Sequence, residues 1–345
     1  MNLAILRRGA FAVGLVAASG LAACSSDQSS VPAAAISAPS PSPTATLTVT
    51  SSAYTAIGAS DAVGFGASVP CANPPIVAAP TCPGGTGYVP LIAAALAKMP
   101  ANVTLLDLGI SGAVIGPDIL AVGNQYGSQG SGAPCRPRTG NDVVPGDFIT
   151  NELPRLSGNE TLVTIFAGGN DTNVLVNAAT CKLAAGSTNA QVQTFLASEI
   201  SAFGFDFNQL ISAVQKKAPG AKIVVANLPN FAGIPFAQTS AVAPAKPLLQ
   251  AVSVGIDTAV YQIAATRSNI PTVDLLCDPR SYDPNNFYTD GFHPDDAGYA
   301  ILAASFYTQI VAASPALPST SCPAMTLASK SVGSAIAPLP FFDHR

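Results

Sequence analysis

The chain has 345 residues, with 15 lysines and arginines against 19 aspartates and glutamates, and a formal net charge of −4. Only 10% of the residues are charged, and the basic ones are scattered beyond the first eight positions. Nucleic-acid binding needs concentrated positive charge, so this composition disfavours such a role and we expect no nucleic-acid partner.

The first 24 residues have the layout of a secretory signal. Arg7 and Arg8 precede an apolar run over 9–22, and small residues lead to Cys24. The run is shorter than the ~20 residues that a membrane-spanning helix needs. Residues 21–24 resemble the bacterial lipobox, in which the cysteine is lipidated and becomes the N-terminus. A plain signal peptide with an incidental cysteine is the alternative.

We therefore expect a lipoprotein signal peptide over 1–23 and an exported protein, held at the periplasmic or cell-surface side of the envelope by a lipid on Cys24. Residues 24–46 are mostly Ser, Pro, Ala and Thr, which bury too little apolar area to fold, and are predicted to form a tether. One domain is expected over 47–314 and a tail packed on or near it over 315–345. The protein is expected to be a monomer that meets the membrane through its lipid only.

Strands and helices alternate along the predicted domain. Strands are predicted over 54–57, 103–108, 161–166, 222–226 and 272–276, and helices over 88–98, 192–217, 246–267 and about 294–312. Strands separated by helices imply βαβ crossovers. The pattern thus predicts an α/β fold, a single three-layer α/β/α domain around a central, mostly parallel sheet.

Small or amide-bearing residues follow three of these strands. Ser60 follows the first, Gly112 the second and Asn170 the third. Ligands of parallel sheets bind beyond the carboxyl ends of the strands, so these residues should meet at one edge. His293, in the loop before the last helix, can join them.

Each of these residues also has an ordinary structural explanation. Ser60 fits a helix N-cap, Gly112 a tight turn, Asn170 an Asx turn, and the Asp290-Gly291 pair a β-turn. Taken singly these explanations are sufficient. They do not explain why all four segments converge on one edge of the sheet.

Four segments carry a family resemblance: residues 58–61 (Gly-Ala-Ser-Asp), 109–112 (Gly-Ile-Ser-Gly), 168–171 (Gly-Gly-Asn-Asp) and 290–294 (Asp-Gly-Phe-His-Pro). In this order they resemble the blocks of the GDSL/SGNH hydrolases, a family of serine esterases and lipases, and the resemblance spans about residues 54–312. It implies an SGNH-hydrolase or flavodoxin-like fold, an ester as substrate, and neither metal nor cofactor.

The chemistry explains why these residue types are needed. A serine hydroxyl needs an adjacent base, and a histidine base needs a partner that fixes its tautomer. We expect Ser60 as nucleophile, His293 as base and Asp290 as its partner. The resemblance implies that the oxyanion hole consists of the N–H groups of Ser60 and Gly112 and the side-chain amide of Asn170.

Two features depart from the family pattern. Ala59 precedes the serine where the family usually has Asp, and Asp61 follows it, so we expect altered support of this loop rather than lost catalysis. Residues 113–160 form a long Gly/Pro-rich segment that is expected to contribute to the substrate wall.

Two other functions are compatible with the same sequence. The scaffold suits a carbohydrate acetylesterase or acyltransferase, because a fold does not fix a substrate. A non-catalytic surface lipoprotein is the third reading. The chain has no Trp, and sugar platforms often use exposed aromatic residues, which favours acyl-chain substrates.

Six cysteines remain once Cys24 is set aside, and an even number in an exported chain argues for disulfides. A zinc site is the rival, but the cysteines form no close pair and only His293 and His344 could assist. Sequence alone does not determine connectivity. Pairing in chain order gives Cys71–Cys82, Cys135–Cys181 and Cys277–Cys322.

Overall fold

A computed structural model describes residues 51–71, 82–98, 102–126, 135–138, 143–267, 270–314 and 317–328. These residues all belong to one compact unit, Thr48–Arg345. The expected signal peptide, Cys24, the tether and His344 lie outside the described residues, as does the end of the predicted tail.

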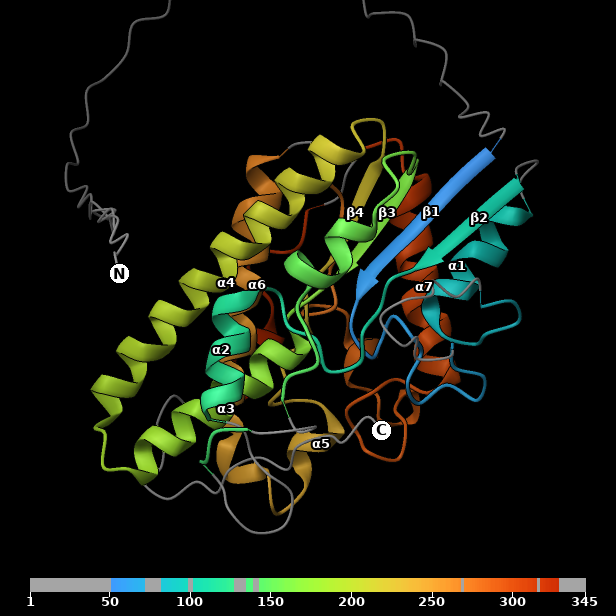
Figure 1. Cartoon of the computed structure of the whole chain (residues 1–345). Helices are drawn as coiled ribbons and strands as arrows, with labels where there is room; N and C mark the ends of the chain where they lie inside the picture. The colour runs from blue at the N-terminus through green and yellow to red at the C-terminus, as the bar shows by residue number, and fades with distance from the viewer. Residues whose placement is uncertain are drawn as a thin grey trace, which may run out of the picture. The chain divides into compact units, whose positions relative to one another are not determined.

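Five parallel strands form the central sheet, in the order β2-β1-β3-β4-β5 (Figure 1). The strands are β1 (Ser51–Gly58), β2 (Asn102–Asp107), β3 (Leu162–Phe166), β4 (Lys222–Ala226) and β5 (Thr272–Val273). Side chains of successive strand residues point to opposite faces, so each strand supplies two apolar cores. In β3, for example, Val163 and Ile165 belong to one core and Leu162 to the other.

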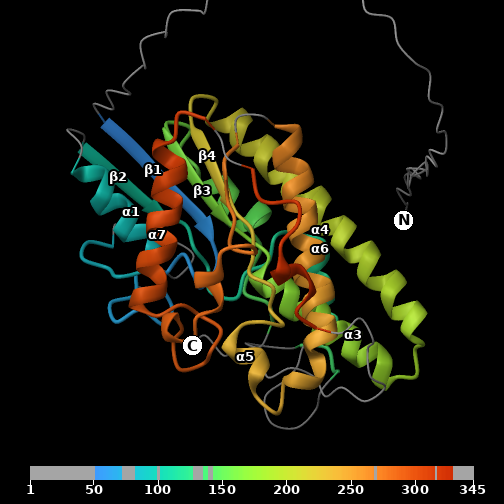
Figure 2. The same ribbon diagram turned by 180° about the vertical axis from the view of Figure 1, so that it is seen from behind.

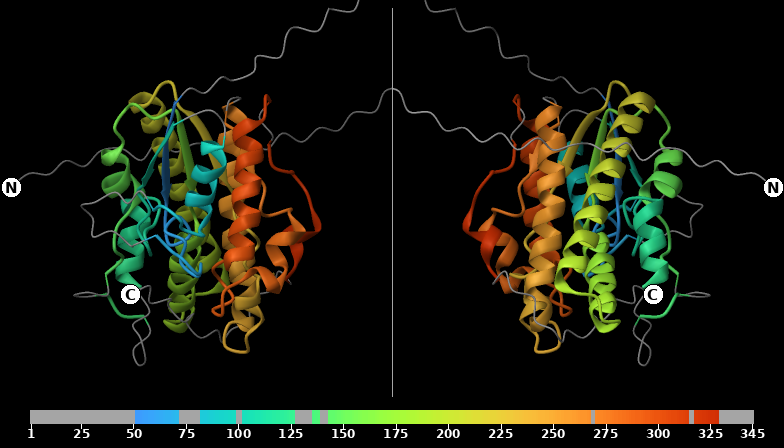
Figure 3. Two further views of the ribbon diagram at one scale, coloured as in Figure 1. Left: turned by 90° about the vertical axis from the view of Figure 1, so that its right-hand side faces the viewer. Right: turned by 90° about the vertical axis from the view of Figure 1, so that its left-hand side faces the viewer.

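Helices cover both faces of the sheet (Figures 1 and 2). One layer holds α1 (Tyr88–Ala97) and α7 (Asp296–Val311), and the other holds α2 (Pro117–Gln125), α3 (Gly169–Ala184), α4 (Asn189–Lys217) and α6 (Lys246–Thr266). The left view of Figure 3 faces α7, and the right view faces α4 and α6. The predicted three-layer α/β/α domain is confirmed.

The loops that connect or follow these elements contain short helical segments. They are the α-helix α5 (Pro235–Gln238), a π-helix over Phe148–Glu152, and 3₁₀ helices over Leu153–Arg155, Ala243–Ala245, Pro279–Tyr282, Pro284–Asn286 and Pro323–Thr326. The long helix α4 begins at a capping box, in which Thr188 and Gln191 exchange side-chain to backbone hydrogen bonds. Asp295 caps α7 by accepting from the Gly298 N–H.

Several elements differ from the sequence expectation. Helix α3 was not predicted, because residues 171–181 are buried without interruption and include polar ones, so its apolar residues show no helical period. Strand β5 is shorter than predicted because the Asn227 side-chain oxygen accepts the N–H groups of Leu275 and Leu276. The long segment over 113–160 also contains α2 and the π-helix, in addition to loops.

Three disulfides occur in the structure: Cys71–Cys82, Cys135–Cys181 and Cys277–Cys322. These are the pairs that chain order suggested. The second joins the segment after α2 to α3, and the third joins the segment after β5 to the chain beyond α7.

One helix in the described part of the chain, Ala243–Thr266, is long and apolar enough to cross a membrane by length and composition alone. Half of it is buried inside the structure, as expected of a helix that packs against a core. Its buried residues, among them Leu249, Val252 and Ile256, contact the core beneath α3 and α4.

Candidate active site

The predicted site residues lie where the carboxyl ends of the first three strands meet. Ser60 stands two residues after β1, Gly112 follows β2, and Asn170 lies in the first turn of α3, directly after β3. The chain can enter α3 this sharply because Gly168 has φ = 109°, a left-handed conformation that suits glycine. Asp290 and His293 come from the loop before α7.

Ser60, His293 and Asp290 form a continuous hydrogen-bonded chain. His293 Nε2 lies 2.9 Å from Ser60 Oγ, and His293 Nδ1 lies 2.7 Å from Asp290 Oδ2. An ionised carboxylate can only accept hydrogen bonds, so Nδ1 carries the ring proton. In the neutral ring Nε2 is therefore the acceptor for the Ser60 hydroxyl.

Several hydrogen bonds hold the Asp290 carboxyl in its ionised form. Burial would raise its pKa, but hydrogen bonding and attraction to His293, together with the N–H groups of Phe292 and His293 at 2.9 and 3.0 Å, hold the pKa of Asp290 below its usual value. The turn needs glycine at Gly291, where φ is 69° and a Cβ would lie 2.8 Å from the Phe236 backbone nitrogen.

Aromatic rings enclose the imidazole. The ring of Phe65 lies 4.6 Å and that of Phe292 4.9 Å from the His293 ring, centroid to centroid. Tyr299 of α7 donates to the Phe65 carbonyl at 2.7 Å and thereby fixes this loop. Ser60 is 1% and His293 0% exposed, so bulk water is kept from the pair and its electrostatic interactions are strengthened.

The loop that follows Gly112 is tied to the start of α3. Gly112 adopts φ = 81°, and the Asn170 side-chain amide donates to the Ala113 carbonyl at 2.9 Å. The Ile115 N–H donates to Asp171 Oδ1 at 2.9 Å. Ser60 and Asn170 line one small cavity together with Ala113, the residue that follows Gly112, and Gly112 is not among the described residues that line it.

Two buried carboxyl groups support the turns beneath Ser60, and the sequence analysis did not identify either. Glu152 accepts from the Gly58 N–H at 3.0 Å, and Asp107 accepts from the Gly109 N–H at 3.0 Å. Burial raises the pKa of Glu152 well above its usual value and that of Asp107 to about 7. Asp107 could have been noticed in the sequence, because it is the only charged residue of its predicted strand. Nothing in the sequence around Glu152 indicates its role.

Among the residues that the structure describes, no group of three or more His, Cys, Asp or Glu side chains is placed to bind a metal ion. The acids named above are engaged with backbone N–H groups or with His293. These carboxyl groups hold the turns and the imidazole in position.

Comparison with known families identifies the class of protein to which the chain belongs. The profile of the GDSL-like lipase/acylhydrolase family matches residues 56–301, and the chain belongs to this family of ester hydrolases. The match begins in β1 and ends in α7, so it includes Ser60, Gly112, Asn170, Asp290 and His293.

Solved structures resemble the chain at low sequence identity. An extracellular lipase from Streptomyces rimosus is 17% identical, with 74% of this chain and 100% of that chain covered and a TM-score of 0.46. Phospholipase A1 from Streptomyces albidoflavus is 18% identical, over 72% and 95%, with a TM-score of 0.45. A family two carbohydrate esterase from Clostridium thermocellum is 14% identical, over 76% and 64%, with a TM-score of 0.39. No curated protein matches the chain.

Proposed function

We propose that the protein is a serine hydrolase that cleaves carboxylic esters through an acyl-enzyme intermediate, with Ser60 as nucleophile, His293 as general base and Asp290 as its partner. The observation that carries the proposal is the 2.9 Å contact between Ser60 Oγ and His293 Nε2. The other nitrogen of the same ring, Nδ1, contacts Asp290. A structural serine would not need a buried imidazole held in this tautomer.

In the first step Ser60 Oγ attacks the ester carbonyl carbon while Nε2 of His293 takes the hydroxyl proton. The carbonyl π electrons move onto oxygen, and the imidazolium is stabilised by the ionised Asp290. Collapse of the tetrahedral intermediate breaks the bond to the alcohol oxygen, which leaves with the proton from Nε2. Water then attacks the acyl-enzyme by the same route and releases the acid and the free serine.

The negative oxygen of each tetrahedral intermediate needs donors that are already in place. The N–H groups of Ser60 and Gly112 and the Asn170 side chain are the proposed donors. The hydrogen bond from Asn170 to the Ala113 carbonyl supports this role, because it uses one amide hydrogen and orients the second without cost at the moment of reaction.

We also propose that the protein is exported and anchored by a lipid on Cys24. Three disulfides support export, because such bonds persist in oxidising compartments. The intact mass of detergent-extracted protein tests the anchor: we expect the mass of the chain from Cys24 plus an acylated glyceryl group. The mass of an unmodified chain, or of one that still carries residues 1–23, would refute it.

Hydrolysis of p-nitrophenyl butyrate by purified protein tests the catalytic proposal. We expect turnover by the wild type and a loss of roughly 10⁶-fold in kcat, down to the assay floor, in Ser60→Ala and in His293→Ala. Ser212→Ala is the matched control, because this serine is exposed on α4, where it donates to the Asn208 carbonyl and accepts from Arg267 and takes no part in the Ser60–His293–Asp290 chain. Activity that survives in Ser60→Ala would refute the proposal.

A further inference from the structure

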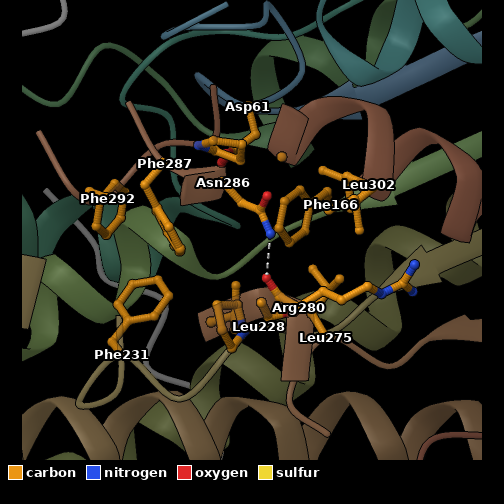
Figure 4. Close-up of a pocket in the computed structure, with 16 residues that line it drawn as sticks. Asp61, Phe166, Leu228, Phe231, Leu275, Arg280, Asn286, Phe287, Phe292 and Leu302 are labelled. Carbon is orange, nitrogen blue, oxygen red and sulfur yellow. Dashed lines mark hydrogen bonds between the residues drawn. The ribbon is translucent and has the colours of Figure 1, made fainter. Parts of the chain in front are cut away.

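A second cavity adjoins the one that holds Ser60. The two cavities share four lining residues, Asp61, Phe166, Gly169 and Phe292. From these the second cavity extends between the ends of β3 and β4, the start of α7 and the loop after β5, as Figure 4 shows. Its volume is about 80 Å³. A single water molecule needs roughly 10–15 Å³ on this measure, so the cavity has room for a group of several heavy atoms.

Apolar side chains form most of the cavity wall. Phe231 and Phe292 stand on one side, Leu228 and Leu275 lie below, and Leu302 comes from α7 (Figure 4). An apolar cavity of this kind gains free energy when it takes up an apolar group and little when it takes up a polar one.

The polar groups at the edge of this cavity are already engaged. The Arg280 guanidinium pairs with Asp278 at 2.6 Å, and the Asn286 amide donates to the Arg280 carbonyl at 2.9 Å, the dashed line in Figure 4. Among the described residues of the wall Asp61 is the one acid, and it stands at the junction beside Ser60. A ligand with a negative charge would meet this carboxyl, and the one cation among these described residues, Arg280, is already paired, so a neutral chain fits best.

The position of the opening indicates which part of an ester enters. The shared residues include the neighbour of Ser60 and the neighbour of Asn170, whereas His293 is absent from the described residues that line either cavity. The leaving alcohol must lie next to Nε2 of His293 to receive its proton. The group that lies between the nucleophile and the oxyanion donors is the acyl part.

We propose that this cavity is the acyl-chain site and that the enzyme prefers neutral acyl chains longer than acetyl. The inference rests on the proposed function and narrows it, because an acetyl-specific carbohydrate esterase would leave the cavity empty. Leu302 of α7 and Leu228 after β4 then set the depth to which a chain can enter.

Two ester series test which group enters. With p-nitrophenol as the constant alcohol, we expect kcat/KM to rise about fourfold for each methylene added from acetate to hexanoate, the gain from burying one CH₂. With acetate as the constant acid, lengthening the alcohol from ethyl to hexyl should give no such rise. A flat acyl series, or a rise in the alcohol series instead, would overturn the proposal.

Substitution in both directions at Leu302 tests the position of the site. Leu302→Phe should lower the ratio of hexanoate to acetate kcat/KM at least tenfold, and Leu302→Ala should raise the relative rate on octanoate. Damage to the fold would move both variants in the same direction. Val311→Phe, an exposed position at the end of the same helix, should leave the ratio at the wild-type value.

The outcomes separate this inference from the proposed function. Suppose that wild type cleaves p-nitrophenyl acetate and Ser60→Ala does not, while both Leu302 variants keep the wild-type ratio of hexanoate to acetate kcat/KM. The catalytic proposal then stands and the proposed acyl site is wrong. If cleavage of the acetate does not require Ser60, the proposed function itself fails.

Discussion

The ionised state of Asp290 decides how the proposed chemistry proceeds. Three hydrogen bonds reach this carboxyl, from the Phe292 and His293 backbone and from His293 Nδ1, and they lower its pKa in spite of burial. The charge keeps the proton on Nδ1 and makes Nε2 the acceptor for the Ser60 hydroxyl. The aromatic rings of Phe65 and Phe292 keep the imidazole in place.

Asp290→Asn should lower kcat by roughly 10⁴-fold with little change in KM. An amide presents N–H groups to Nδ1 and favours the tautomer with hydrogen on Nε2, which cannot take the serine proton. Steady-state kinetics on p-nitrophenyl butyrate measure the effect. Asp283→Asn is the control, since Asp283 serves only the exposed turn before Asn285. A kcat within tenfold of wild type in Asp290→Asn would contradict the assigned role.

The residues that carry chemistry could be predicted from the sequence more readily than those that support them. His293 stands out as the only histidine in the predicted domain, and Ser60 and Asn170 follow apolar strands. Glu152 could not be found in this way. Its partner is a backbone N–H that lies 94 positions away in the chain, and its own segment has no periodic pattern. Only the tertiary fold brings the two together.

At the level of elements, the sheet and the amphipathic helices were predictable, while α3 and the end of β5 were not. The strands are apolar runs between turn residues, and α4 and α6 bury one side each. Helix α3 lies between the sheet-side core and three other helices, α2, α4 and α6, so its polar residues Thr172 and Thr180 are buried and bond to carbonyls four positions earlier. A hydropathy pattern does not reveal that a buried threonine hydroxyl is hydrogen-bonded within its own helix, so the helix could not be predicted from it.

The disulfide between Cys277 and Cys322 should contribute more to stability than the one between Cys71 and Cys82. The first closes a loop of 45 residues and the second a loop of 11, and a longer loop loses more entropy in the unfolded chain. Double Cys→Ser variants should lose about 4 and about 3 kcal/mol respectively. Thermal unfolding of both variants measures the order. Equal losses, or the reverse order, would show that native contacts rather than loop closure dominate.

Across the whole molecule, buried carboxyl groups should make stability depend on pH in a direction opposite to that of paired ones. Burial raises the pKa of Asp107 and of Asp171 to about 7, from the ordinary value of 3.8 for an exposed aspartate. Between these values the folded protein holds protons that the unfolded chain has released. The free energy of unfolding therefore falls as pH rises from about 4 to about 7, by up to ~1.4 kcal/mol per pH unit for each carboxyl.

Asp107→Asn should flatten this dependence, because the amide oxygen still accepts from the Gly109 N–H and cannot ionise. We expect urea unfolding at pH 4.5, 6.0 and 7.5 to show that the free energy of unfolding of the variant increases relative to that of the wild type as pH rises. Asp278→Asn is the opposite control. Burial raises the pKa of Asp278, but hydrogen bonds and the charge of Arg280 outweigh it and lower the pKa.

The loss from Asp278→Asn should therefore be present at neutral pH, begin to shrink near pH 4, where the unfolded chain takes up its proton, and vanish only below the lowered pKa of the folded carboxyl. Parallel pH profiles for wild type and Asp107→Asn would show that Asp107 is ionised in the folded protein at every pH tested.

Labelling with a fluorophosphonate tests the central claim most directly, because this reagent reports the activated nucleophile whatever the natural ester is. Purified protein is reacted with the reagent, digested and mapped by mass spectrometry. We expect a single adduct on Ser60 that is lost in His293→Ala, where the serine is unchanged but its base is missing. An adduct on another residue, or no adduct on folded wild-type protein, would contradict the account.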